Sequence, residues 1–210
     1  MHRLTTCTLA LTAALAAAGC ATTTFSSIWK APDVPQIVLS GQKVAAVVMV
    51  PDDGTRRAAE EALAAELTKR GAAGVASYTF LSGQDLKDEA AAKAHLQQAG
   101  MQGVVIMRVV SQDQSVTYSP STWSRGYYPS FGGYWGYGWG AVYSPGYIRT
   151  DTIVNVETLV YSLTADKLLW AGVSGTTNPS RVDAFVTEIV DEAAKEMRKS
   201  GLLPTRWEQR

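Results

Sequence analysis

Residues 43–50 read KVAAVVMV, a continuous run of mostly apolar residues. Runs of this kind are typical of a central strand that is buried on both faces of a sheet. Asp52 and Asp53 follow the run and offer side-chain oxygens that can cap the first turn of a helix. We therefore predict a strand and then a helix over about 56–70, which Gly71 ends in the position where glycine commonly terminates helices.

The rest of the chain continues the alternation of strands and helices. We predict strands over 74–81, 103–118, 148–164 and 167–176, and helices over 86–99 and from 178–180 onward. The expected order is β-α-β-α-β-β-β-α. This order predicts an α/β fold with an α+β tendency, in which helices pack on a mixed sheet of about five strands. The first part of that sheet should be parallel and the second part antiparallel.

The last helix has the clearest pattern in the chain. Apolar residues recur at helical spacing from Val182 to Met197 and form a wide stripe. Asn178, Pro179 and Ser180 precede the stripe and are expected to start the helix, because asparagine and serine are favoured caps. We expect this stripe to cover one face of the sheet.

The connection between the two long strands, residues 119–147, differs in composition from the rest of the chain. Glycines alternate there with aromatic residues, and Arg125 is its only charged residue. The candidate binding residues are Trp123, Tyr127, Tyr128, Phe131, Tyr134, Trp135, Tyr137, Trp139 and Tyr143.

Four interpretations of this aromatic run remain open. Tyrosine and tryptophan give a protein-binding surface much contact area at low entropic cost. The rings can instead cover the protein's own sheet, contact the membrane interface where such residues concentrate, or stack on glycans. The near absence of charge counts against glycans and against single-stranded nucleic acid, which needs a basic groove. The leading hypothesis is a protein partner in the cell envelope.

The N-terminus has the features of a secretory signal. A positive start at His2 and Arg3 precedes an apolar segment, 4–18, which is too short for a membrane span of about 20 residues. The segment ends Ala-Ala-Ala-Gly-Cys and resembles the bacterial lipobox, except that Ala17 stands where leucine is usual. The resemblance implies that residues 1–19 are a cleaved lipoprotein signal peptide and that Cys20 is lipidated.

Lipidation at Cys20 has consequences for the mature chain. Cys7 lies in the cleaved segment, so the mature chain has one cysteine and no partner for a disulfide. Several acyl chains give stable anchoring without a membrane-spanning helix. Ala21 replaces the aspartate of the inner-membrane retention pattern, which implies the periplasmic face of the outer membrane of a Gram-negative bacterium.

The sequence then divides into three parts. Residues 20–41 are expected to be a lipidated N-terminus and tether, 42–203 a periplasmic α/β domain, and 204–210 a tail. Phe25, Ile28 and Trp29 lie within the first part. They are expected to dock on the domain or to form a short edge strand there.

Three short segments carry a family resemblance: Trp29–Pro32, Leu159–Leu163 and Lys167–Gly172 (Lys-Leu-Leu-Trp-Ala-Gly). They resemble a family of bacterial outer-membrane lipoproteins of uncharacterised activity with small periplasmic α/β domains. More loosely, the domain is similar to those of the curli secretion lipoprotein and of penicillin-binding-protein activators. The resemblance implies location and fold, and it provides no catalytic residues.

No catalytic or cofactor motif stands out. His95 is the only histidine after cleavage, and there is no paired-cysteine or His-Glu-x-x-His zinc motif. The formal net charge is +0, so no broad basic field attracts nucleic acid. We expect a non-enzymatic envelope lipoprotein without cofactor, metal or nucleic-acid partner. A protein that binds or processes peptidoglycan and a purely structural lipoprotein remain as alternatives.

Overall fold

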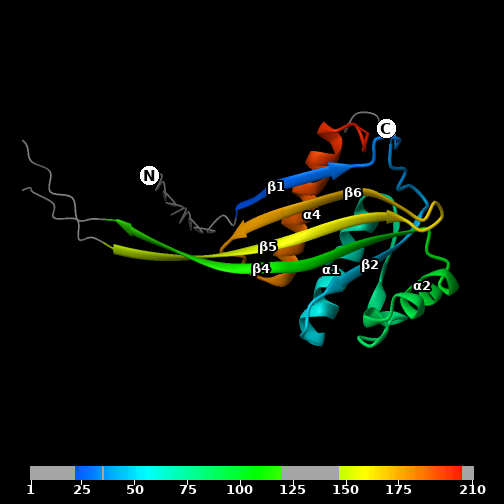
Figure 1. Cartoon of the computed structure of the whole chain (residues 1–210), viewed down its shortest axis with the longest axis horizontal. Coiled ribbons are helices and arrows are strands. Elements are labelled where there is room, and N and C mark those ends of the chain that lie inside the picture. Colours follow the sequence, from blue (N-terminus) through cyan, green and yellow to red (C-terminus); the bar gives the residue numbers. More distant parts are fainter. Residues whose placement is uncertain (1–21, 35, 120–146, 205–210) are drawn as a thin grey trace, which may run out of the picture.

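The computed structural model describes residues 22–34, 36–119 and 147–204 (Figure 1). The strands are β1 (Thr22–Lys30), β2 (Lys43–Met49), β3 (Ala73–Ala76), β4 (Gly103–Ser119), β5 (Tyr147–Ser162) and β6 (Lys167–Thr177). The helices are α1 (Asp53–Lys69), α2 (Glu89–Gln98) and α4 (Val182–Lys199), with 3₁₀ turns η1 (Ser77–Thr79) and η2 (Asp85–Lys87).

The strands form one mixed sheet in the order β1-β6-β5-β4-β2-β3. β2 is parallel to β3 and β4, whereas β4, β5, β6 and β1 pair antiparallel. The predicted α/β class and the change from parallel to antiparallel pairing are confirmed. The sheet has six strands rather than about five, because β1 joins it at the edge beside β6.

The apolar run of β2 is buried on both faces, as predicted. Its alternate residues Val44, Ala46 and Val48 belong to one hydrophobic cluster, and Ala45 and Val47 belong to another. The first cluster lies under α1 and α4, and the second lies under α2 on the opposite face. α1 and α4 therefore form one layer behind the sheet (Figure 1), and α2 covers part of the other face.

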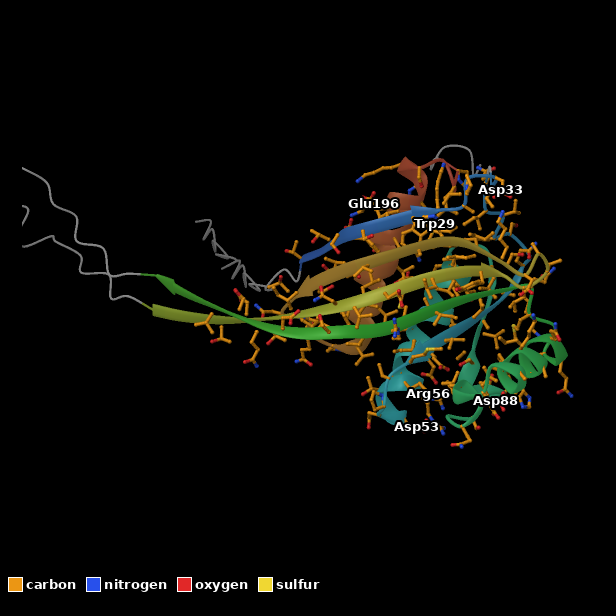
Figure 2. The ribbon with its side chains drawn as sticks, viewed as in Figure 1. Trp29, Asp33, Asp53, Arg56, Asp88 and Glu196 are labelled. Atoms are coloured by element: carbon orange, nitrogen blue, oxygen red, sulfur yellow. The ribbon has the colours of Figure 1, made fainter. Side chains whose placement is uncertain are left out.

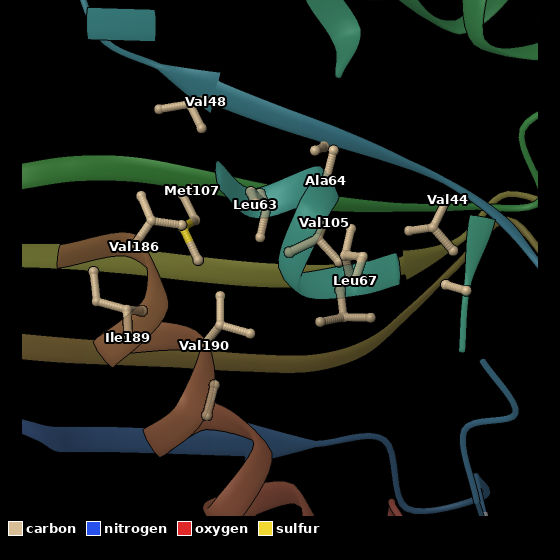
Figure 3. Packing of buried hydrophobic residues seen from close by; sticks show 14 of the residues in the cluster. Val44, Val48, Leu63, Ala64, Leu67, Val105, Met107, Val186, Ile189 and Val190 are labelled. Atoms are coloured by element: carbon tan, nitrogen blue, oxygen red, sulfur yellow. The ribbon is translucent and has the colours of Figure 1, made fainter. Parts of the chain in front are cut away.

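The stripe of α4 packs where the sequence places it. Val186, Ile189 and Val190 are buried against Met107 of β4 and the apolar face of α1 (Figure 3). The helix begins only at Val182, however, and its N-cap residue makes no side-chain hydrogen bond. The side chain of Asn178, expected at the start of this helix, forms hydrogen bonds with β5 instead.

The predicted strand over 74–81 is shorter in the structure, because a buried carboxylate accepts a hydrogen bond from its backbone. Glu60 of α1 is fully buried, and it accepts hydrogen bonds from Tyr78 N (2.6 Å), Ser77 Oγ (2.8 Å) and Val48 N (3.2 Å). The N–H of Tyr78 thus donates to the Glu60 side chain of α1 rather than to a neighbouring strand, and β3 ends at Ala76. The same carboxylate fixes α1 to both neighbouring segments.

β1 is held to β6 by core contacts as well as by its ladder. The Phe25 ring meets the fully buried Trp170 ring edge-on, with centroids 5.5 Å apart. The hydroxyls of Thr23 and Thr176 share a buried hydrogen bond of 2.6 Å. Residues 22–30, within the stretch expected to be a tether, therefore form an edge strand of the domain.

Candidate functional site

The residues singled out from the sequence lie outside the described part of the chain. This holds for Cys20 and for the aromatic candidates Trp123, Tyr127, Tyr128, Phe131, Tyr134, Trp135, Tyr137, Trp139 and Tyr143. Their predicted roles therefore stay predictions. The structure does describe the two strands that carry the run, up to Ser119 and from Tyr147.

These two strands extend beyond the rest of the sheet. β2 pairs with β4 only as far as Arg108, and β6 pairs with β5 only from Ile153 onward. Among the described strands, β4 from Asp113 to Ser119 pairs only with β5, and β5 from Tyr147 to Thr152 pairs only with β4. We call this two-stranded projection the arm (Figure 1).

A β-bulge marks the base of the arm. The register between β4 and β5 shifts between Val109 and Ser111, so that one extra residue, Val110, stands in β4. Bulges bend a strand and increase its twist. The sequence predicts a one-sided strand from Ser111 onward, but residues 111–116 are exposed throughout, since neither a helix nor a third strand packs against them within the described residues.

One polar cluster ties the two strands together beside the bulge. Asn155 of β5 donates through Nδ2 to Ser111 Oγ (2.8 Å) and to Asp113 Oδ2 (3.0 Å). Ser111 Oγ also donates to Asp113 Oδ2 at 3.0 Å. Gly175 of β6 makes room for this cluster, since a Cβ there would lie 2.9 Å from the Asn155 side-chain oxygen.

A second cluster ties β5 to the end of β6. Asn178 has a φ of 50°, a left-handed conformation that asparagine tolerates better than most residues. Its Oδ1 accepts from Thr152 N (2.9 Å), its N–H donates to Thr152 O (2.7 Å), and its Nδ2 donates to Asp151 Oδ1 (2.6 Å). Sequence reasoning missed both clusters; the asparagine after a strand was the available signal for the second.

The front face of β1, β6 and the middle of β5 has no helix over it among the described residues (Figures 1 and 2). Trp29, Ala171, Leu159 and Ile106 are consecutive partners across this face, and Trp29 is 47% exposed. α2 covers only the end of this face, where Ile106 packs. The exposed face and the arm form one continuous surface.

Two general properties follow from the described residues. They include no group of three or more histidine, cysteine, aspartate or glutamate side chains arranged to hold a metal ion. None of the helices in the described ranges has the length and hydropathy to cross a membrane.

No protein-family model and no curated protein matches the sequence. Among solved structures, the chain is similar to the PelC dodecamer from Paraburkholderia phytofirmans, with 12% identity and a TM-score of 0.44 over 88% of this chain and 100% of that chain. It is also similar to lipoprotein GNA1162 from Neisseria meningitidis, with 14% identity and a TM-score of 0.42 over 76% and 99%. Likeness at these TM-scores carries no argument about activity, ligand or assembly.

Proposed function

We propose that the protein is a non-enzymatic, lipid-anchored binding module of the bacterial cell envelope that acts through the arm. Its lipid would be attached at Cys20 and its domain would lie at the periplasmic face of the outer membrane. The observation that carries the proposal is the projection of β4 and β5 beyond every other described strand.

The physical reason is that such an arm is unfavourable in isolation. A two-stranded ribbon is at best marginally stable in water, and its free edges expose unpaired backbone groups. Val116, well out on the arm, is 64% exposed. The two polar clusters nevertheless hold the base in one register, and the strands lead directly into the aromatic run. An exposed but well-positioned element of this kind is suited to contact a ligand.

Labelling and cross-linking test the two parts of this proposal separately. Cys20→Ser should abolish palmitate incorporation, and retention of the label would refute the anchor. A photo-cross-linking residue at Trp135 or Trp139 should give abundant adducts in intact cells, and the same residue at Gln102, at the opposite end of β4, should give few. Equal adducts at both ends would refute the arm as the binding element.

A further inference from the structure

The register of the sheet places the arm and Thr22, the described residue nearest in sequence to the proposed anchor Cys20, at the same end of the domain. Thr22 is the Cα partner of Thr177, Thr177 of Ile153, and Ile153 of Asp113. The four residues form one row across β1, β6, β5 and β4. Cys20 precedes this row by two residues, since it directly precedes Ala21. The base of the projecting arm lies on the same row.

The arm extends further from this row than the anchor can. From Asp113 to Ser119, six residues at about 3.4 Å each give a length of about 20 Å. The two residues from Thr22 back to Cys20 span at most about 7 Å when fully extended. β1 and β5 run in the same direction, so the first residue of β1, Thr22, lies at the end of β1 that faces the arm (Figure 1).

This short connection limits how the domain can stand on a membrane. If the strands are perpendicular to the bilayer, the arm reaches the lipid before any other part of the domain. If they are parallel to it with β1 nearest, β4 lies three strands away, about 15 Å from β1 at the usual strand spacing. The reverse perpendicular orientation would place the domain itself inside the bilayer. Every permitted orientation leaves the arm close to the lipid.

The chemistry of the arm suits the headgroup layer rather than the hydrocarbon. Its free backbone edges need water or another donor and acceptor, which the hydrocarbon core does not provide. Between the bulge and Val116 the described charged residues of the arm are Asp113 on β4 and Asp151 on the paired part of β5, and the other described side chains there are uncharged. In the sequence, Tyr118 is the second-last residue of β4 and Tyr147 is the first residue of β5. Tyrosine and tryptophan concentrate at membrane interfaces.

We propose that the distal end of the arm docks on the headgroup layer of the same membrane that holds the lipid of Cys20. This inference rests on the anchor in the proposed function and names the ligand of the arm. The domain is thereby held to the membrane at two points, the lipid and the arm. Two points fix its orientation, which one lipid on a flexible tether does not do.

The test uses the lipidated mature protein in vesicles of phosphatidylethanolamine and phosphatidylglycerol. Because Cys20 is acylated, Ser119→Cys takes up an environment-sensitive fluorophore at one site, and Ala165→Cys, in the β5–β6 turn at the opposite end of the sheet, is the matched control. The label at residue 119 should lose fluorescence on lipids brominated near the headgroup and be shielded from iodide. The label at residue 165 should show neither effect.

The outcomes separate this inference from the anchor. A label at residue 119 that iodide quenches equally with and without vesicles overturns the inference, even if the protein floats with the vesicles. Protection that appears only after an envelope protein extract is added also overturns it, in favour of a protein ligand. Failure to float with the vesicles refutes the anchor itself. Ser115→Cys provides a second position on the arm if Ser119→Cys impairs folding.

Discussion

Replacing Glu60 tests whether one buried carboxylate joins α1 to β2 and to the segment after β3. In Glu60→Ala, the N–H groups of Val48 and Tyr78 lose their acceptor in a site closed to water, whereas the Ser77 hydroxyl can rotate to another partner. An unsatisfied buried donor costs about 1–3 kcal/mol. Two such donors predict a loss of about 4 kcal/mol, a large part of the 5–15 kcal/mol typical of a domain.

The measurement is urea unfolding, followed by circular dichroism, of the chain from residue 20 with Cys20→Ser, which removes the lipid. Glu60→Gln keeps one acceptor oxygen but turns an NH₂ group toward the other N–H, so it should lose about half as much, roughly 2 kcal/mol. Glu61→Ala is the control: Glu61 is exposed on the same helix turn, and it accepts a hydrogen bond from the Tyr78 hydroxyl (2.6 Å) at an exposed position where water can replace it, so the free energy of unfolding should change by less than about 1 kcal/mol. If Glu60→Ala loses no more than this control, the assigned role of the carboxylate is wrong.

Three further predictions concern a close contact in the core, a partly buried ion pair and a helix cap. Gly172→Ala should cost about 1–3 kcal/mol, because the new Cβ would lie 2.5 Å from the Trp170 ring; an unchanged urea midpoint would contradict this packing. Burial raises the pKa of Glu66, but hydrogen bonds from basic neighbours including Arg70 outweigh it, so its folded-state pKa lies below the usual 4.5. Glu66→Gln should therefore destabilise the protein above about pH 4.5. The deficit should shrink as the pH falls through the folded-state pKa, in urea titrations at pH 7 and pH 3. Asp88→Ala should cost about 1 kcal/mol by removing the cap of α2, and a melting temperature equal to the parent's would refute it.

The parts of the fold that were predictable from the sequence depend on local pattern. The apolar run of β2, the stripe of α4 and the glycine after α1 each specify an element through neighbours a few residues away. The change from parallel to antiparallel pairing was predictable because strands that alternate with helices pair in parallel, whereas strands joined directly pair antiparallel. The close approach of α1 to the sheet was also predictable, because small residues allow it: a Cβ on Gly74 would lie 2.2 Å from Ala64 O.

The features that the sequence left open or missed depend on partners distant in the sequence. For residues 22–30 the sequence left open docking on the domain or a short edge strand, and the structure shows the edge strand, in which Phe25 contacts Trp170 about 145 residues away along the chain. The end of β3 depends on Glu60, whose burial no local pattern reveals. Asn178 looks like a helix cap in the sequence, yet its amide binds Thr152 and Asp151 on another strand. In each case a tertiary contact overrides the local preference.

The placement of β1 connects the stability of the core to the orientation on the membrane. Because β1 joins the sheet from Thr22, the anchor that we propose at Cys20 would be two residues from the domain in the sequence instead of about twenty. A flexible tether of about twenty residues would give an average reach of about 25 Å, enough to let the domain turn freely. A connection of two residues does not allow this rotation. Phe25 and Thr23, which hold β1 in place, would therefore also keep the arm directed at the lipid surface in the proposed arrangement. Loosening β1 should thus free the orientation of the domain before it unfolds the rest of the sheet.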